Sequence, residues 1–178
     1  MKRIYLAAPF EWIDRMKSYA QQLRALGFEV TSRWLDDQDK GGETDLTDED
    51  GSTNLEQDKK ALAIGYAVRD IRNILVSDTV IEFNPGKALV RNTRLAELGG
   101  ALFLGKQCIV IGPENPKHRS RIDTIFVLLE EGTLPEDLVK AGIKPVKHFD
   151  TWGDFLETAV IEAGSKNGIP STIANSAA

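Results

Sequence analysis

The distribution of hydrophobic residues predicts that strands and helices alternate along this chain. Compact apolar runs, each short enough for a buried strand, occur at 3–8 (RIYLAA), 28–34 (FEVTSRW), 79–83 (TVIEF), 107–112 (QCIVIG) and 144–149 (KPVKHF). Between them, apolar residues recur with helical spacing at 12–26, 53–75, 91–106, 121–131 and 151–163. Gly27 stands where the first of these helices should end, and TNLE at 53–56 has the form of a capping box at the start of the second.

This alternation favours an α/β fold in which helices cover both faces of a parallel sheet. Right-handed crossovers then give a doubly wound, Rossmann-like or flavodoxin-like sheet of about five strands. We expect one domain over 1–164, since 178 residues are few for two. The segment 35–54 is acidic, contains several glycines and has no apolar period, so it is predicted to be a surface loop; 165–178 is predicted to be a polar tail.

Composition and charge narrow the class of function. The net charge of -5 argues against a nucleic-acid polymer as partner, which needs a basic face, but leaves a small anionic ligand possible. No stretch approaches the ~18 apolar residues that span a bilayer, and the N-terminal apolar run is too short for a signal peptide. We therefore expect a cytoplasmic protein with no membrane partner. Cys108 is the single cysteine, so an internal disulfide is excluded and a buried core thiol is expected.

Ligands of doubly wound sheets bind at the carboxyl ends of the strands. The residues expected there, and therefore the candidate binding residues, are Ala8, Pro9, Phe10, Trp34, Phe83 and Asn84. Phe10 and Trp34 could enclose a planar ligand or simply pack at the rim. No G-x-G-x-x-G follows the first strand and no Walker lysine motif occurs, so dinucleotide binding and NTP hydrolysis are unsupported and no cofactor is expected.

The acidic loop loosely resembles a calcium-binding loop, beginning at Asp37 and Asp39. Its fifth position is Gly41, however, and neither flank looks like the helix that such a site requires. We expect no metal ion.

Glu97 is the first candidate for chemistry. On a helix over 91–106 it lies on a stripe that runs from Thr93 and Arg94 to Ala101 and Leu104, from polar to apolar, where a half-buried carboxylate would sit. The alternative is a surface glutamate paired with Arg94. Two glycines at 99 and 100 each cost about 1 kcal/mol in a helix, and we expect that they let a neighbouring segment approach closely.

Asp70 and Tyr5 are the other two candidates. Asp70 lies beside the predicted core stripe of the helix 53–75, which is Ile64, Ala67 or Val68, Ile71 and Leu75. It could reach a cleft or remain a solvated aspartate. The hydroxyl of Tyr5, in a strand buried on both faces, needs a partner, and a carboxylate is a plausible one; an ordinary core tyrosine is the alternative.

Three segments in this order and spacing, IYLAAPF, RDIRNILVSDTVIEF and RLAELGGALFLGKQCIVIG, resemble the nucleoside 2-deoxyribosyltransferase family, whose relatives include the deoxynucleoside 5'-monophosphate N-glycosidases. The resemblance covers about residues 1–112. It implies that Glu97 is a nucleophile, that Tyr5 orients it, and that Asp70 contacts or protonates the base. The implied reaction cleaves the N-glycosidic bond of 2'-deoxyribonucleosides or their 5'-monophosphates through a covalent deoxyribosyl-Glu intermediate, with transfer to another base or to water.

The resemblance also implies a homo-oligomer, because relatives complete their sites with an Asn or Ser from a neighbouring subunit; Asn115, His118 and Ser120 are the candidates here. The chain departs from its relatives at Arg91, where transferases tend to have Asp and nucleotide hydrolases Ser. Together with Arg94, Arg91 could bind a 5'-phosphate, whereas Glu11 would repel it. A non-catalytic nucleotide-binding or sensing module on the same fold is the alternative function.

Overall fold

The computed structural model describes residues 2–36, 53–84, 93–112 and 134–166, with the backbone alone described at 53–64, 93–95 and 162–166. Within these ranges the chain forms a parallel five-stranded sheet in the order β2-β1-β3-β4-β5. The strands are β1 Arg3–Ala7, β2 Glu29–Val30, β3 Thr79–Phe83, β4 Gln107–Ile111 and β5 Lys147–Phe149. This is the flavodoxin-like strand order, which reverses direction between β1 and β3, and the predicted doubly wound α/β fold is confirmed.

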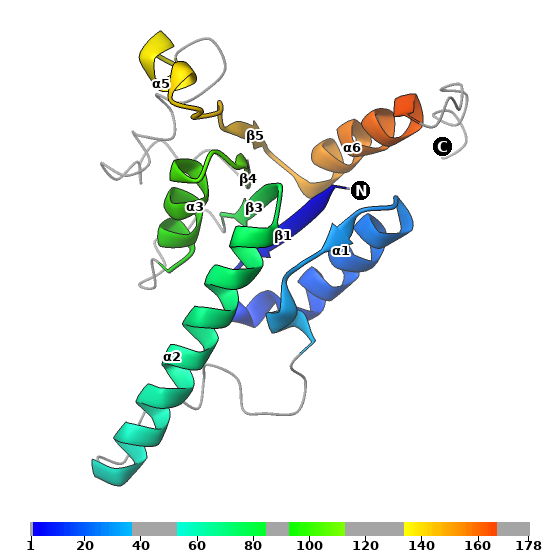
Figure 1. Ribbon diagram of the computed structural model, residues 1–178. Helices are drawn as coiled ribbons and strands as arrows, with labels where there is room; N and C mark the ends of the chain where they lie inside the picture. The colour runs from blue at the N-terminus through cyan, green and yellow to red at the C-terminus, as the bar shows by residue number, and fades with distance from the viewer. Residues whose placement is uncertain (1, 37–52, 85–92, 113–133, 167–178) are drawn as a thin grey trace.

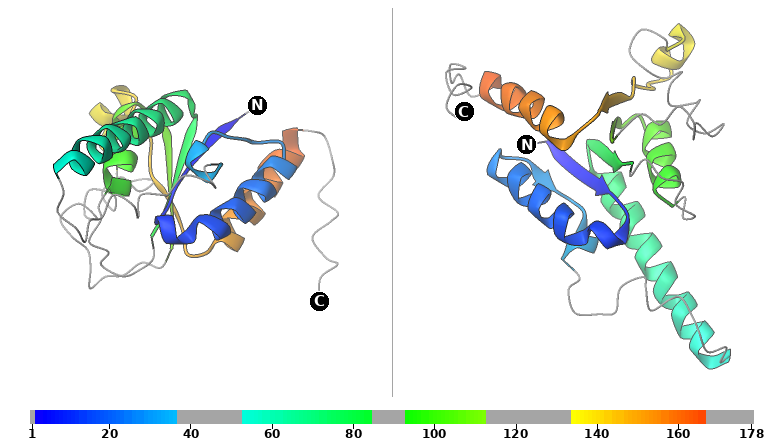
Figure 2. Two further views of the ribbon diagram at one scale, coloured as in Figure 1. Left: turned by 90° about the horizontal axis from the view of Figure 1, so that it is seen from below. Right: turned by 180° about the vertical axis from the view of Figure 1, so that it is seen from behind.

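Helices cover both faces of the sheet (Figures 1 and 2). On one face lie α1 Ile13–Ala25 and α6 Trp152–Lys166, and on the other lie α2 Thr53–Val76 and α3 Thr93–Phe103. The shorter helices are η1 Phe10–Trp12, η2 Arg33–Leu35 and α5 Glu136–Lys140. None of the helices in the described ranges is both long and apolar enough to cross a membrane.

The core lies on both sides of β1, β3 and β4. Because successive strand residues face opposite sides, Tyr5, Val80 and Cys108, which are in register, point towards α2 and α3. Cys108 is fully buried, as expected, and burial raises the pKa of its thiol to about 12. The two faces therefore have separate side-chain sets, and the face with Tyr5 is the one that carries the candidate chemistry.

The first helix ends as the sequence predicts. Gly27 has a φ of +85°, a conformation that side chains disfavour, and its N–H bonds the carbonyl of Arg24 at 3.0 Å. The next strand is shorter than predicted. Beyond Val30, Ser32 Oγ accepts a hydrogen bond from the N–H of Leu6, and Trp34 Nε1 donates to the carbonyl of Leu6 at 2.9 Å. Side chains thus replace the backbone ladder, and the chain turns into η2.

Other boundaries differ slightly from the prediction. β5 begins at 147 rather than 144, α6 continues to 166, and the short helix α5 was not predicted. Of the predicted acidic loop 35–54, the two ends belong to η2 and α2, and 37–52 lies outside the described residues, as do the helix predicted at 121–131 and the tail from 167 onward. The calcium-like positions Asp37, Asp39 and Gly41 fall in that outside segment.

The predicted core stripe of α2 is wrong. Among the described side chains, Val68, Ile71 and Leu75 are exposed, Ile71 at 57% of its surface. The inward side of the helix instead carries Asn73 and Ile74, which are buried, with the half-buried Tyr66, Arg69 and Asp70 one and two turns earlier. The helix therefore turns a polar side towards the sheet and leaves an apolar side uncovered within the described part of the chain.

Candidate active site

A hydrogen bond between β1 and α3 forms the centre of the site. The Tyr5 hydroxyl donates to Glu97 Oε1 at 3.2 Å, across 92 residues of sequence. Tyr5 is 1% exposed, and Glu97 is half-buried. Glu97 is therefore not a purely solvated surface glutamate, because a buried phenol fixes one of its oxygens.

The Tyr5 hydroxyl is held in its protonated, donating form. Burial raises the pKa of Tyr5 far above its ordinary value, and the negative charges of Glu97 and Asp70 raise it further, while the positive charge of Arg69 opposes them. A phenol that stays protonated donates to the carboxylate it bonds, and its hydrogen bond to an ionised acceptor is stronger than one to a neutral acid. Tyr5 thus favours ionised Glu97.

α3 supports this geometry through its packed side. Leu98, Ala101 and Leu102 are buried against the sheet, so Glu97 lies at the margin of the core face. The side chain of Arg94 lies outside the described residues, and so does the alternative pairing of Glu97 with Arg94.

The described residues give no support to the reason we expected for the two glycines of α3. Apart from α3 itself, no described segment places an atom within 4 Å of a Cβ built on Gly99 or Gly100, and Gly100 is exposed. Within the described chain no segment uses the missing side chains to approach α3.

Asp70 enters the site from α2 together with a residue that the sequence reasoning missed. Arg69 Nε lies 3.4 Å from Asp70 Oδ1, and the two side chains are only 24% and 17% exposed. The Arg69 guanidinium also stacks over the Tyr66 ring, 4.9 Å from its centroid. Tyr66, Arg69 and Asp70 are spaced i, i+3 and i+4, which places them on one side of a helix; that spacing was the available signal for Arg69.

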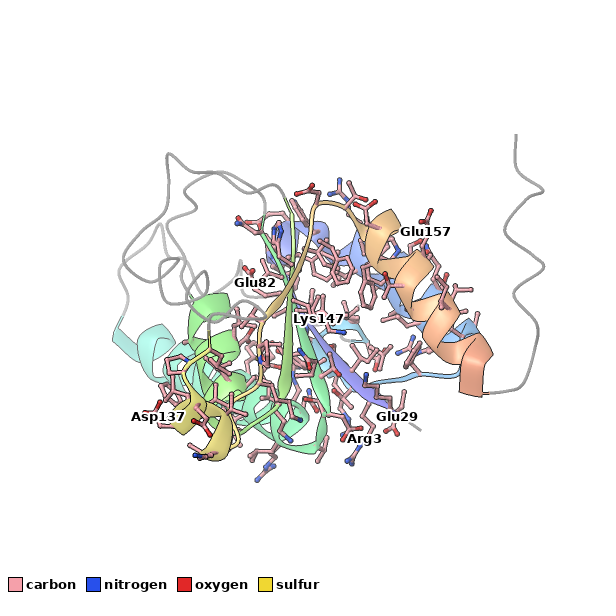
Figure 3. All side chains as sticks on the ribbon, turned by 90° about the horizontal axis from the view of Figure 1, so that it is seen from above. Arg3, Glu29, Glu82, Asp137, Lys147 and Glu157 are labelled. Atoms are coloured by element: carbon pink, nitrogen blue, oxygen red, sulfur yellow. The ribbon has the colours of Figure 1, made fainter. Side chains whose placement is uncertain are left out.

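Glu82 is a second missed residue. It is buried, and its register with Ala7 and Val110 places it on the same face of the sheet as Tyr5, at the carboxyl end of β3. Figure 3 shows Glu82 on the side of the sheet opposite to α6, whereas Lys147 leaves the sheet on the other side. A charged residue inside the otherwise apolar run TVIEF was the signal.

The candidate binding residues divide into two groups. Phe83 packs on the opposite face of the sheet, where its ring is stacked on Tyr19 at 5.6 Å and tilted against Trp152 at 5.9 Å between centroids, so the structure does not bring it to Glu97. Trp34 is largely buried, and its indole nitrogen is bonded to β1.

The remaining candidates lie at strand ends or outside the described residues. Asn84 follows β3, and its N–H bonds the carbonyl of Ile111 at 2.8 Å. Gly112, with a φ of +141°, lets this end of β4 approach closely, because a Cβ there would collide with the Asn84 carbonyl. Ala8, Pro9 and Phe10 follow β1, with Pro9 buried and the other two half-buried. Arg91 lies outside the described residues.

Metal-binding chemistry has no support in the described ranges, where no three His, Cys, Asp or Glu residues gather as ligands.

The sequence matches no protein-family model and no curated protein sequence. The fold is similar to that of the CMP N-glycosidase BcmB of Clostridium botulinum, with 18% identity and a TM-score of 0.47 over 90% of this chain and 99% of that one. It is also similar to a conserved protein from Enterococcus faecalis, with 18% identity and a TM-score of 0.49 over 91% of this chain and 99% of that one.

Proposed function

We propose that this protein cleaves the N-glycosidic bond of 2'-deoxyribonucleosides or their 5'-monophosphates, with Glu97 as the nucleophile. The observation that carries the proposal is the 3.2 Å hydrogen bond from the buried Tyr5 hydroxyl to the half-buried Glu97 carboxylate, with Asp70 close enough for its charge to act on the same phenol. A non-catalytic sensor has no need of a carboxylate that is kept ionised and partly withdrawn from water.

The chemistry of such a site follows from its charges. As the bond between C1' and the base nitrogen breaks, its electron pair leaves with the base and positive charge develops on the sugar. The Glu97 carboxylate stabilises that charge and forms a bond to C1', which gives a deoxyribosyl-Glu intermediate. Asp70 contacts the base or supplies its proton. A second base or a water molecule then attacks C1' and gives up a proton to Asp70 or to solvent, while Glu97 leaves as a carboxylate.

The decisive experiment incubates the protein with a panel of deoxynucleosides and deoxynucleotides, with and without a free acceptor base. Released base without acceptor indicates hydrolysis, and a new nucleoside indicates transfer. Glu97→Gln keeps the shape and the helix but removes the charge, so we expect turnover to fall by several orders of magnitude with the fold intact. Glu157→Gln, at an exposed position of α6, is the matched control and should keep full activity.

Mass spectrometry tests the covalent step directly. A protein quenched with a slow 2-fluoro-2-deoxy substrate should carry a sugar adduct on the peptide that contains Glu97. Near-normal turnover by Glu97→Gln, or an adduct on another peptide, would remove Glu97 from this role. Tight nucleotide binding with no base released under any condition would favour the sensing module.

We further propose that Arg91 distinguishes phosphorylated from unphosphorylated substrates. It precedes α3, whose N-terminus favours an anion, by two residues. Loss of a charge-assisted contact costs on the order of 1.5–3 kcal/mol. Arg91→Ala should therefore lower the affinity for a 5'-monophosphate about tenfold to a hundredfold and leave the affinity for the nucleoside unchanged. Equal losses on the two substrates would instead indicate a contact with the base or a structural role.

A further inference from the structure

Three charged groups act on the buried Tyr5 hydroxyl. Two are carboxylates, Glu97 from α3 and Asp70 from α2, and the third is the Arg69 guanidinium, also from α2. Two carboxylates beside one buried phenol oppose each other's ionisation, because each negative charge favours the protonated form of the other. Something must offset that repulsion if both are to be ionised in the resting protein.

Arg69 is placed to do so. Its Nε lies 3.4 Å from Asp70 Oδ1, at the long end of hydrogen bonding, so attraction between the charges contributes more than bond geometry. Consecutive residues on a helix do not normally face each other, and stacking of the guanidinium on Tyr66 accounts for its turn towards Asp70. Side chains that are 24% and 17% exposed are also less screened than a surface pair.

We propose that Arg69 is a positioning residue, held by the Tyr66 ring, that fixes Asp70 beside the Tyr5–Glu97 pair and keeps both carboxylates ionised. Of the two roles open to Asp70, this selects contact with the base, and the departing base then takes its proton from water. Arg69 acts through Asp70 and need not touch the substrate. The inference rests on the proposed function of the site, although its first test does not require turnover.

The consequence is a dependence on pH with a definite direction. The positive charge of Arg69 favours ionised carboxylates, so its removal raises the pH at which they take up protons. Protonated Glu97 cannot attack C1', and the acid limb of the rate profile therefore moves to higher pH. Among the described residues, Tyr5 from β1 and Glu97 from α3 are titratable groups that interact with Asp70 or share its partner. Glu82 from β3 lies on the same face of the sheet as Tyr5, and η2, which packs against α2, carries the exposed Arg33.

The test is a carbon-detected NMR titration of the side-chain carboxyls in the substrate-free protein, with the Asp70 signal assigned from Asp70→Asn. We expect Arg69→Gln to raise the titration midpoint of Asp70 by about one pH unit, since an opposite charge within ~4–6 Å lowers the pKa of an aspartate by one to three units. Arg69→Lys keeps the charge and should restore most of the wild-type midpoint. Arg72→Gln, an exposed arginine of the same helix, is the matched control and should leave the midpoint unchanged.

Turnover provides the second readout. At pH values on the acid limb, the turnover rate of Arg69→Gln should be roughly tenfold lower than that of the wild type, and the two rates should converge at alkaline pH. A residue with a merely structural role would instead lower the rate equally at every pH. If Arg69→Gln does not fold, Tyr66→Leu leaves the charge in place but frees the guanidinium, and it should raise the Asp70 midpoint by a smaller amount.

The inference is overturned if Arg69→Gln, or Tyr66→Leu in its place, leaves the Asp70 midpoint where it is in the wild type. It is also overturned if Arg72→Gln shifts that midpoint as far as Arg69→Gln does. Its failure is distinguishable from that of the proposed function. If wild-type protein releases no base from any substrate, the proposed function fails, whereas the titration still decides the role of Arg69.

Discussion

At the residue scale, the pair formed by Tyr5 and Glu97 gives the site its chemical character. Because its pKa is raised, the Tyr5 phenol stays protonated and donates a hydrogen bond to Glu97, and this bond is stronger when Glu97 is ionised. A carboxylate fully exposed to water would be ionised without help, but water would also weaken its attack on the sugar. Partial burial with one fixed donor is a compromise between these demands.

We predict that Tyr5→Phe impairs catalysis without unfolding the protein. The substitution keeps the buried ring and removes the hydroxyl that bonds Glu97 Oε1. Loss of a charge-assisted hydrogen bond of about 1.5–3 kcal/mol corresponds to a tenfold to hundredfold lower kcat/KM. The comparison is Tyr19→Phe, which changes a tyrosine stacked on Trp152 across the sheet and should leave kcat/KM unchanged. Equal effects of the two substitutions would mean that the Tyr5 hydroxyl serves stability alone.

The residues of this site were predictable to different degrees. The residue pattern made Tyr5, Asp70 and Glu97 candidates but left an ordinary structural alternative open for each, and the family resemblance singled them out. Arg69 and Glu82 were missed because a charge in a helix or strand is ordinarily solvated, and only the three-dimensional packing shows that these two are enclosed. Phe83 was placed at the site on the basis of its strand end, but the alternation of strand faces turns it towards α1 and α6.

At the element scale, periodicity predicted where the strands and helices lie better than which side of a helix is buried. The bounds of β3 were predicted without error, since TVIEF is a compact apolar run between polar residues. The inward side of α2 was predicted wrongly, because its apolar stripe was taken as the core stripe, whereas the helix turns Asn73, Asp70 and Tyr66 inward. β2 was overestimated because Ser32 and Trp34 bond β1 through their side chains, which no residue pattern shows.

The junction between α2 and β3 gives a prediction about stability. Asp78 accepts hydrogen bonds from the backbone N–H of Arg3 at 2.8 Å and from its guanidinium at 3.3 Å, and its own N–H bonds the carbonyl of Arg3. These hydrogen bonds lower the pKa of Asp78 below its ordinary value, and the bond from the backbone N–H of Arg3 contributes most. The ionised carboxylate thus ties the start of β1 to the start of β3.

We predict that Asp78→Asn lowers the stability at neutral pH by about 1 kcal/mol or less, since the side chain is 41% exposed. Because the folded-state pKa is lowered, the contribution is fully present above the unfolded value and is lost as the pH falls through the folded value. Denaturant midpoints of wild type and variant should therefore converge in acid. A gap that persists unchanged below pH ~2 would show that the charge of Asp78 is not the cause. Glu157→Gln, which removes a charge at an exposed position of α6, is the control and should leave the denaturant midpoint unchanged.

At the scale of the whole molecule, the long helix α2 relates the site to an apolar surface that the other described residues leave uncovered. α2 extends beyond the carboxyl edge of the sheet (Figure 1), and its inner side carries Asp70 while its outer side carries exposed apolar residues. We use the term α2–α3 face for the exposed large hydrophobic residues of α2 and of the end of α3. These residues are Val68, Ile71, Leu75, Val76, Phe103 and Leu104. The two helices are joined at this point, because Lys106 Nζ, just after α3, donates to the carbonyl of Leu75 at 2.8 Å.

An apolar face of this kind is costly to leave in water, and monomeric proteins rarely keep large ones. Phe103 is 83% exposed and Ile71 57% exposed. A second copy of the chain, related by a two-fold axis, would place the same face against itself and bury it. This agrees with the self-association expected from the sequence resemblance, and it provides an independent, physical reason for it.

We predict that the protein self-associates through the α2–α3 face. Light scattering at assay concentration should give at least a dimer, and Ile71→Asp combined with Phe103→Asp should give a folded monomer, because two carboxylates cannot be buried against an apolar partner without a large desolvation cost. Ile161→Asp is the matched control, since Ile161 is 68% exposed but lies on α6, across the sheet, and it should leave the assembly intact.

The activity of the monomeric variant then relates assembly to the site. If a neighbouring subunit completes the site, the monomer should lose turnover in the same concentration range in which the wild type dissociates, and raising the wild-type concentration should restore its turnover. Circular dichroism must show unchanged helix content, so that dissociation is separated from unfolding. A wild-type monomer with full turnover would defeat the prediction and leave the α2–α3 face without a second copy as its partner. If the double variant still forms a dimer, the interface must lie on another surface.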